Sequence, residues 1–289
     1  MSTFVVRAPA TTANLGPGFD CAAAALDLWN EVEVEQHWDS GALVEVEGEG
    51  ADELPRDETH MTLRAFALLA PVERYRFRFT NRVPLERGLG SSAAAVALGL
   101  VAAATVAPRP RDELVALGTE LEGHADNVAA AVHGGVVLTW RNGAGRRVAR
   151  VASDLPLAPV VVVPEERVGT AGSRDRLPSV VEHADAAAAA AQAALLGAAI
   201  AAADPKLLAD AMHDRLHEPY READAPLLAA IRGDLPAGAA GVTLSGSGPS
   251  VVVWTQKGRV EPVAGELRAR FPDARVLELR VAAEGAEAR

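Results

Sequence analysis

The sequence predicts an α+β protein of two domains, and three observations support this fold class. Strand-like and helical patterns interleave without the regular strand–helix alternation of a parallel α/β sheet. Several predicted strands lie in pairs joined by short turns, which is typical of antiparallel hairpins. The chain has 289 residues, of which 49% are hydrophobic, enough for two modest cores. We expect one domain at residues 1–155 and a second at 156–289.

A period of two in polar and apolar residues predicts the strands of the first domain. The clearest case is Glu31 to Glu35, and Phe4 to Arg7, Leu43 to Val46 and Tyr75 to Phe79 share the period. We interpret the charged positions of these strands as a sheet face open to solvent. Residues 8–19 are rich in proline, glycine and asparagine, so a loop is expected there.

After Pro84 the hydrophobic period becomes helical. It predicts helices over 91–106, 112–123 and 125–132. The Asn142-Gly143 pair lies between two strand-like runs, 136–140 and 148–151, which predicts a hairpin.

In the second domain a run of four valines ended by Pro164 predicts a buried strand. The long alanine-rich stretch that follows predicts a helix. The remaining expected elements are helices at 206–213, 225–232 and 261–270, and strands at 242–244, 250–254 and 275–281.

Composition narrows the classes of function. The formal net charge is −11 and the pI is about 5.2, so the surface repels nucleic acid and anionic lipid, and neither is an expected partner. The single cysteine, Cys21, excludes an intramolecular disulfide. We find no signal-peptide pattern before Pro9, and we interpret the apolar stretches 93–107 and 186–203 as helices of a soluble, cytoplasmic protein. A homodimer remains open.

The strongest signal for chemistry is a glycine-rich segment in front of a helix. Gly88 and Gly90 allow positive φ and a close approach of the backbone to a ligand. Ser91 and Ser92 suit a helix start, whose free N–H groups and dipole favour a phosphate. The expected phosphate-binding segment comprises Pro84, Leu85, Glu86, Arg87, Gly88, Leu89, Gly90, Ser91, Ser92, Ala93 and Ala94. It has neither the lysine of a Walker A loop nor a Rossmann fingerprint.

Three further polar segments accompany this loop. They span residues 10–20, 122–127 and 245–250. Together the four segments resemble the GHMP kinase superfamily of small-molecule kinases, along nearly the whole chain. The resemblance implies an N-terminal domain like ribosomal protein S5, a ferredoxin-like C-terminal domain, and phosphorylation of a hydroxyl group by ATP with Mg²⁺. It also adds Gly246 and Gly248 to the ATP-binding residues.

Within the superfamily these segments are similar to those of the homoserine kinases. The likeness extends to Thr170-Ala171, to Arg174 through Pro178, and to Asp214 through Arg221. Residues 21–24 and Gly172-Ser173 depart from the family pattern. The resemblance implies L-homoserine as the second substrate.

The resemblance also implies roles for substrate-binding residues. Asn14 and Asp20 correspond to ligands of an ammonium group, and Arg174 and Arg221 to a carboxylate clamp, for which a guanidinium is suited. Arg176 and Arg215 compete with these two arginines. Thr170 and His124 complete the implied substrate-binding set.

For the metal, the resemblance implies Glu122 with Ser92, or with Ser91, while Glu120 competes with Glu122. His124 and Asn127 are the implied neighbours of the reacting hydroxyl, and Asp126 is either the catalytic base or a structural cap. The other histidines, including His213 and His217, are expected to be structural or exposed.

Two alternatives remain. Another GHMP kinase, such as mevalonate kinase, would need a carboxylate clamp but no partner for an ammonium group, so Asp20 and Asn14 argue against it. An inactive sensor on the same fold would show damage to the phosphate loop or the metal ligand, and the sequence shows none.

Overall fold

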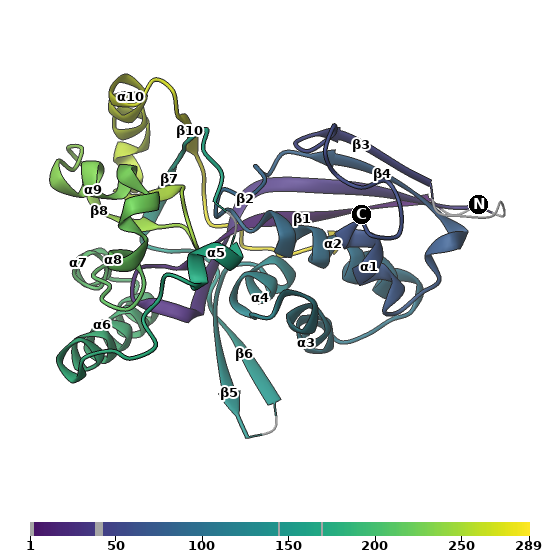
Figure 1. Ribbon diagram of the computed structural model, residues 1–289, viewed down its shortest axis with the longest axis horizontal. Coiled ribbons are helices and arrows are strands. Elements are labelled where there is room, and N and C mark those ends of the chain that lie inside the picture. Colours follow the sequence, from purple (N-terminus) through teal and green to yellow (C-terminus); the bar gives the residue numbers. More distant parts are fainter. Residues whose placement is uncertain (1–2, 38–42, 144, 169) are drawn as a thin grey trace.

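The computed structural model describes residues 3–37, 43–143, 145–168 and 170–289, without the side chains of Thr170 and Ala171. The described chain forms two halves, each built on one β-sheet (Figure 1). The predicted α+β class is therefore confirmed by the arrangement of its elements.

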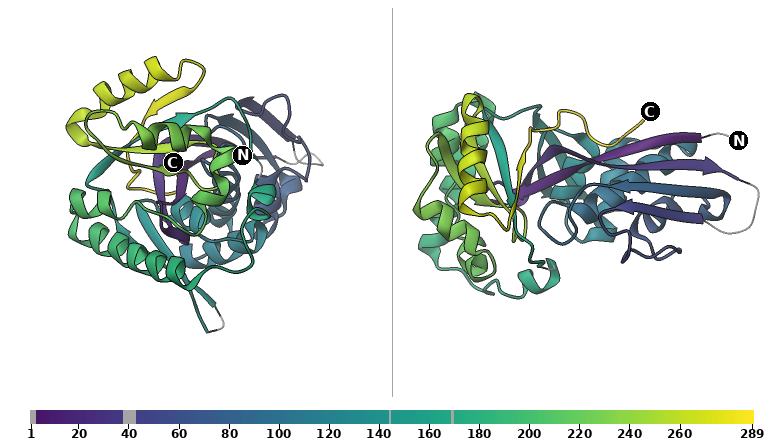
Figure 2. Two further views of the ribbon diagram at one scale, coloured as in Figure 1. Left: turned by 60° about the vertical axis from the view of Figure 1, so that its left-hand side comes forward. Right: turned by 90° about the horizontal axis from the view of Figure 1, so that it is seen from above.

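The first sheet has seven strands within the described residues, in the order β11-β1-β2-β4-β3, with β5 paired to β2 and β6 to β5. All pairs are antiparallel except β3 with β4. The strands are β1 (Thr3–Asn14), β2 (Gly18–Gln36), β3 (Leu43–Gly48), β4 (Tyr75–Asn81), β5 (Val136–Asn142), β6 (Gly145–Ala152) and β11 (Glu287–Ala288). The β5–β6 hairpin projects from the body of the molecule (Figure 1 and Figure 2).

Helices cover one face of this sheet (Figure 2). The other face carries charged side chains. The covering helices are α1 (Met61–Ala67), α2 (Ser91–Val106), α3 (Arg111–Glu122) and α4 (Asp126–His133), and a 3-10 turn, η1 (Val72–Arg74), precedes β4. On the charged face Arg78 pairs with Glu33 and Glu35. The predicted solvent-facing side of the sheet is confirmed.

The second sheet has the order β10-β7-β9-β8. Its strands are β7 (Leu157–Val163), β8 (Ala239–Leu244), β9 (Val251–Gln256) and β10 (Arg275–Glu278). Its helices are α6 (His183–Ala202), α7 (Pro205–Asp210), α8 (Glu218–Arg221), α9 (Pro226–Gly233) and α10 (Val260–Arg270), with the 3-10 turns η2 (Glu222–Asp224) and η3 (Lys257–Arg259). The short α5 (Thr170–Arg174) lies between the two halves (Figure 1).

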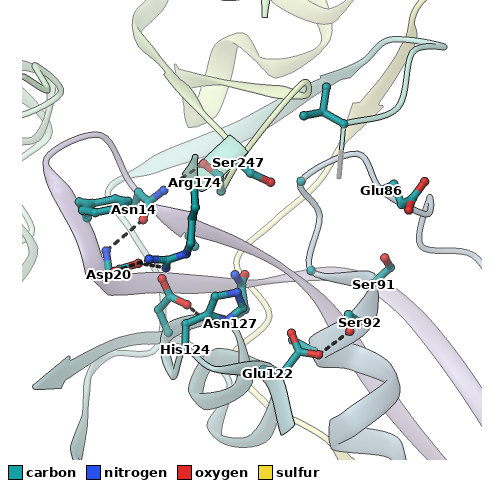
Figure 3. A pocket seen from close by; sticks show the side chains of 18 of the residues that line it. Asn14, Asp20, Glu86, Ser91, Ser92, Glu122, His124, Asn127, Arg174 and Ser247 are labelled. Atoms are coloured by element: carbon teal, nitrogen blue, oxygen red, sulfur yellow. Dashed lines mark hydrogen bonds and ion pairs between the residues drawn. The ribbon is translucent and has the colours of Figure 1, made fainter. Parts of the chain in front are cut away.

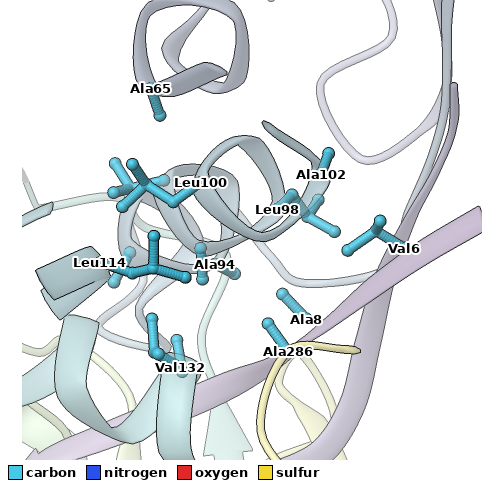
Figure 4. Close-up of a cluster of buried hydrophobic side chains, with 14 of the residues drawn as sticks. Val6, Ala8, Ala65, Ala94, Leu98, Leu100, Ala102, Leu114, Val132 and Ala286 are labelled. Carbon is cyan, nitrogen blue, oxygen red and sulfur yellow. The ribbon is translucent and has the colours of Figure 1, made fainter. Parts of the chain in front are cut away.

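Three clusters of buried apolar side chains hold these layers together. The first lies between the seven-stranded sheet and its helices, where Leu98 of α2 faces Val6 of β1 and Leu100 lies on the side of α3 (Figure 4). The third lies between the second sheet and α9 and α10. The second cluster contains residues of both halves, among them Leu26, Leu196 and Trp254. The two halves therefore share a core and support one fixed site between them.

Two predictions about strands were wrong. Residues 8–14 continue β1, because the ladder with β2 absorbs Pro9 at a shift in register. Only the turn 15–17 separates the two strands. The strand expected over 275–281 ends at Glu278, after which the chain crosses back and pairs β11 with β1. The expected boundary between 155 and 156 falls between β6 and β7 and remains a prediction.

By length and composition alone, α6 is apolar enough to cross a membrane, and 22% of its apolar window is buried in the protein. Leu196, Ala199 and Ile200 of α6 pack into the shared core.

Candidate active site

The four polar segments meet at one pocket of about 240 Å³ between the two halves (Figure 3). Both domains contribute to its walls. The lining residues are Ala13, Asn14, Phe19, Asp20, Glu86, Gly88, Gly90, Ser91, Ser92, Ala93, Glu122, His124, Asp126, Asn127, Val168, Arg174, Arg221, Gly246 and Ser247.

The turn between β1 and β2 is fixed by a side-chain amide. Asn14 donates from Nδ2 to the carbonyl oxygen of Gly246 at 3.0 Å, and its Oδ1 accepts from the backbone N–H of Asp20 at 3.2 Å. Asn14 and Asp20 both have positive φ, 73° and 57°, which asparagine and aspartate tolerate better than other side chains. Asn14 therefore joins the first strand to the loop of the second domain and directs Asp20 into the pocket.

The glycine-rich segment leaves no room for side chains where it turns. Gly90 is the residue before α2, with φ of 65°, and a Cβ on it would lie 1.9 Å from Oγ1 of Thr11. A Cβ on Gly88 would lie 2.2 Å from the carbonyl oxygen of Ser245. Ser245 Oγ in turn donates to the carbonyl of Gly88 at 2.7 Å. The N-terminal turn of α2 therefore presents its backbone N–H groups at the pocket.

The predicted phosphate-binding residues divide into those that line the pocket and those that hold the loop. Six of them line it, as does Gly246: Glu86, Gly88, Gly90, Ser91, Ser92 and Ala93. Arg87 donates to the carbonyls of Pro164 and Glu165 at 2.9 and 2.6 Å, so it anchors the loop to the end of β7. The others, Pro84, Leu85, Leu89, Ala94 and Gly248, do not line the pocket; Leu89 and Ala94 are fully buried.

The expected metal ligands lie side by side. Ser92, in the first turn of α2, donates its hydroxyl hydrogen bond to Oε1 of Glu122, the last residue of α3. Glu120 is exposed and does not line the pocket. A hydroxyl and a carboxylate next to a phosphate-binding helix end match the oxygen ligands that Mg²⁺ prefers, since that ion takes few protein ligands besides phosphates and water. The geometry favours Glu122 over Glu120.

The start of α4 brings three further predicted residues to the same wall. Asp126 is buried, and its Oδ1 accepts from the backbone N–H of Asn127 at 2.7 Å. Burial raises the pKa of Asp126, and the nearby Asp20 carboxylate acts in the same direction. Asn127 Oδ1 accepts from the hydroxyl of Thr11 at 2.6 Å, which leaves its Nδ2 for a ligand oxygen. Within the described residues the buried Nδ1 of His124 has no hydrogen-bond partner.

A pair of opposite charges lies at the far end of the pocket from α2. Arg174 donates from Nη2 and Nη1 to the two carboxylate oxygens of Asp20, at 2.5 and 3.1 Å. The competing Arg176 instead pairs with Asp224 at 2.5 Å, away from the lining residues. The geometry therefore favours Arg174 over Arg176.

A second arginine enters the pocket from α8. Arg221 is 3% exposed, and burial lowers its pKa. Its guanidinium lies 5.4 Å from the ring of Phe19, and that of Arg174 lies 5.8 Å from the same ring. Arg215 pairs with Asp185 at the surface, so Arg221 is the arginine of this segment that reaches the site.

Sequence reasoning missed five residues at or behind the pocket. Ala13, Phe19, Val168 and Ser247 line it, and His217 lies behind Arg221. Phe19 and Ser247 adjoin predicted residues in the same segments, which could have indicated them. The side chain of Thr170, also predicted to bind substrate, lies outside the described residues.

Comparisons with known proteins identify the family of this chain. The family model of the GHMP kinase N-terminal domain matches residues 59–135, and that of the C-terminal domain matches 196–273. The chain belongs to the GHMP kinase family, whose members are ATP-dependent kinases of small molecules. Within that family it belongs with the homoserine kinases.

Two similar homoserine kinases place the chain within that group of the family. A homoserine kinase of Streptomyces avermitilis is 42% identical over 269 residues, which cover 90% of this chain and 88% of the relative. One from Streptomyces coelicolor is 43% identical over 278 residues, with the same two coverages.

Solved structures agree with the fold. A homoserine kinase from Cytophaga hutchinsonii superposes with a TM-score of 0.90 at 26% identity, covering 100% of this chain and 98% of its own. Mevalonate kinase from L. major has a TM-score of 0.74 at 16% identity, covering 97% and 96%, and shows the fold alone. The predicted two-domain GHMP kinase fold is thus confirmed.

Proposed function

We propose that this protein transfers the γ-phosphoryl group of ATP to the side-chain hydroxyl of L-homoserine, giving O-phospho-L-homoserine and ADP in threonine biosynthesis. The observation that carries the proposal is the arrangement of charge along one pocket. A helix N-terminus suited to phosphate lies at one end, and a carboxylate with two guanidinium groups lies at the other. Such a pocket is complementary to a triphosphate and to an amino acid that carries a hydroxyl.

The substrate end fits a zwitterion. Asp20 offers a carboxylate to the α-ammonium group, and Asn14 holds the backbone of Asp20 in place. Arg174 and Arg221 offer guanidinium groups to the α-carboxylate, for which bidentate hydrogen bonds are possible. Mevalonate carries no ammonium group, so it would leave Asp20 without a cationic ligand. The charges therefore support homoserine over mevalonate.

The phosphate end fits ATP and Mg²⁺. Gly88 and Gly90 let the loop pack directly against Ser245 and Thr11, and the N–H groups at the α2 N-terminus, which lines the pocket, would bind phosphate oxygens. Ser92 and Glu122 would hold the metal ion. When bound, Mg²⁺ supplies neutralisation of the charge on the β- and γ-phosphates.

In the transfer, the homoserine hydroxyl oxygen forms a bond to the γ-phosphorus while the bond from that phosphorus to the ADP oxygen breaks. Asp126 receives the hydroxyl proton, because its raised pKa makes it a stronger base than an ordinary carboxylate. Asn127 and His124 orient the reacting oxygens from the same helix start. The protein residues thus contribute positioning, charge and a proton acceptor.

We place this reaction in the cytoplasm, and we propose no nucleic-acid or membrane partner for a chain of net charge −11. Whether two copies form a homodimer is a question for measurements of mass in solution. An inactive sensor is disfavoured because the phosphate loop and Glu122 are both in place.

ATP turnover in a coupled assay tests the proposal, with homoserine, mevalonate, shikimate and galactose as separate acceptors. We expect turnover with homoserine at least 100-fold above the other three at equal concentration. A larger rate with mevalonate would overturn the substrate assignment but not the kinase class. Absence of turnover with all four, in a folded protein that binds ATP, would overturn the assignment of homoserine.

A further inference from the structure

A histidine that the proposed reaction does not use lies directly behind the substrate end of the pocket. His217 is completely buried and precedes α8. Its Nε2 lies 2.9 Å from the carbonyl oxygen of Gly16, in the turn between β1 and β2. Its Nδ1 lies 3.2 Å from Nη1 of Arg221. The ring stacks on Phe19 with centroids 5.0 Å apart. His217 therefore touches both the turn that precedes Asp20 and the buried arginine.

The two partners determine the protonation of the ring. A carbonyl oxygen only accepts hydrogen bonds, so Nε2 carries a proton and donates to Gly16. A guanidinium only donates, so Nδ1 must be unprotonated and accept from Arg221. The geometry thus requires the neutral Nε2–H tautomer. Burial lowers the pKa of His217, which favours this neutral form at physiological pH.

Three charged groups act on the ring of His217, namely Asp214, Arg221 and Asp20. Asp214 lies 3.7 Å from Nε2, but its carboxylate accepts from the backbone N–H groups of Leu216, His217 and Glu218. Arg221 lies on the other side of the ring, and the charge of Asp20, at the start of β2, acts from the pocket. A second proton on His217 would place a positive charge against Arg221.

Arg221 has few other restraints. Its Nη1 also donates to the carbonyl of Gly246 at 3.3 Å, and its buried Nε has no partner in the described part of the chain. Among those residues no carboxylate lies within ion-pair distance of Arg221, whereas Arg174, Arg176 and Arg215 each have one. Arg221 is therefore free to receive an anionic ligand, and His217 provides one of its two hydrogen-bonded supports.

We propose that His217 is a positioning residue, which holds the guanidinium of Arg221 for the carboxylate of the amino-acid substrate and does so only in its neutral form. This inference rests on the proposed function, since it assigns to Arg221 the substrate carboxylate. It adds a residue that touches neither substrate nor nucleotide, and it makes substrate affinity dependent on the protonation of a group outside the pocket.

Three substitutions separate the two hydrogen bonds. His217→Asn keeps an acceptor near the position of Nδ1, His217→Gln keeps a donor near that of Nε2, and His217→Phe keeps only the stacking on Phe19. The readout is the Kd of homoserine, measured by calorimetry with a non-hydrolysable ATP analogue, beside kcat and the KM for ATP. The matched control is His213→Asn, an exposed histidine in the same segment.

We expect His217→Gln and His217→Phe to weaken homoserine binding by roughly 10- to 100-fold, the range for a hydrogen bond to a charged group. His217→Asn should recover most of that loss, and kcat and the KM for ATP should change less than threefold in all three. In a double-mutant cycle, His217→Phe should cost little more once Arg221→Ala is present, because His217 acts through that arginine.

Wild-type protein gives a test that needs no variant. As pH falls and His217 takes up a proton, the Kd of homoserine should rise, and His217→Asn should flatten that dependence. A purely structural role would instead lower the unfolding temperature without this pH profile. The inference is overturned if His217→Gln and His217→Phe bind homoserine like wild type, or if their loss persists undiminished beside Arg221→Ala. If Arg221→Ala itself leaves homoserine affinity unchanged, the assigned role of Arg221 in the proposed function fails as well.

Discussion

Asp20 and Arg174 lie 154 residues apart in the sequence and form a bidentate ion pair across the pocket, with N–O distances of 2.5 and 3.1 Å. Each is the residue proposed to bind one charge of the substrate. A zwitterionic ligand can replace this pair by two new ones, ammonium with Asp20 and carboxylate with Arg174. A ligand with a single charge leaves one member of the pair without a partner, at a cost in free energy.

The first prediction follows from this pair. Asp20→Asn should lower kcat/KM for homoserine roughly 30- to several-thousand-fold, because the ammonium loses its partner. This factor corresponds to a loss of about 2–5 kcal/mol in transition-state stabilisation. With 4-hydroxybutyrate, which lacks the amino group, the loss should be much smaller, since Arg174 is then released for the carboxylate. The measurement is a comparison of both enzymes with both substrates, with the KM for ATP nearly unchanged.

The control for this comparison is Asp185→Asn, which makes the same chemical change in the surface pair with Arg215. It should leave both substrates unaffected, because surface ion pairs contribute little. If Asp20→Asn weakened the two substrates equally, Asp20 would serve the loop or the metal and not the ammonium group.

The second prediction concerns the metal ligand. Glu122→Gln should lower kcat at least 100-fold with little change in the Kd of homoserine, because the carboxylate acts on the transferring phosphoryl group through the metal ion. Glu120→Gln is the matched control on the same helix and should stay within about twofold of wild type. Steady-state kinetics over a range of Mg²⁺ concentrations would measure both, and a larger loss in Glu120→Gln would reverse the assignment.

The third prediction concerns the glycine before α2. Gly90→Val should abolish ATP binding, and Gly90→Ala should already weaken it strongly, because any Cβ there would meet Thr11 Oγ1 at 1.9 Å. Gly123→Ala is the matched control: its φ of 81° is also positive, but it has no atom within 4 Å of a Cβ. Calorimetry with a non-hydrolysable ATP analogue gives the affinities, and circular dichroism checks folding. Near-normal affinity in Gly90→Val would contradict the prediction.

The fourth prediction concerns stability at low pH. His60 is buried, precedes α1 and accepts from the backbone N–H of Thr62, and burial lowers its pKa to about 4. Between pH 6.5 and about 4 the unfolded chain binds a proton that the folded protein excludes. The free energy of unfolding should therefore decrease as the pH is lowered from 6.5 to about 4, and His60 should contribute at most about 3 kcal/mol to that decrease. Below about pH 4 this contribution should stay constant, because His60 is then protonated in both states.

His60→Asn keeps a capping acceptor without a titrating ring and should reduce this slope. The half-buried His133 and the buried His217, whose pKa values are also lowered, should account for the part of the slope that remains. Urea unfolding at several pH values is the measurement, with the exposed His213→Asn as control. An unchanged slope in His60→Asn would show that other groups cause the pH dependence.

Sequence patterns predicted an element correctly where residues close in the sequence determine its structure. The helix predicted over 91–106 has those same bounds in α2, because its glycine start and alanine-rich body are local features. β1 was not predicted beyond Arg7, because residues 8–14 and their partners at 22–26 are buried on both faces. Ala8 and Ala13 pack into the first core while Ala10 packs into the shared one, so no polar alternation marks the strand.

Some residues of the site could likewise be proposed from the sequence, and others required the structure. Gly90 and Ser92 could be proposed from their own segment, because a glycine-rich helix start favours phosphate binding, whereas Glu122 was proposed from the resemblance; all three line the pocket. The resemblance favoured Arg174 over Arg176, but the physical reason required the structure, because both lie in one segment and only their distant partners, Asp20 and Asp224, distinguish them. His217 could not be found from its neighbours, since its contact with Gly16 spans 201 residues.

The pairing of β11 with β1 has a consequence for how the chain matures during synthesis. Val6 and Arg7 leave the ribosome early, but their partners Ala288 and Glu287 follow about 280 residues later. Until then one edge of β1 is unpaired, and an open strand edge can pair with another chain. The first domain is therefore able to fold around its helices while nascent, but this edge of its sheet is covered only after the second domain has been made. Synthesis of the second domain, not completion of the first, sets the moment when that edge is protected.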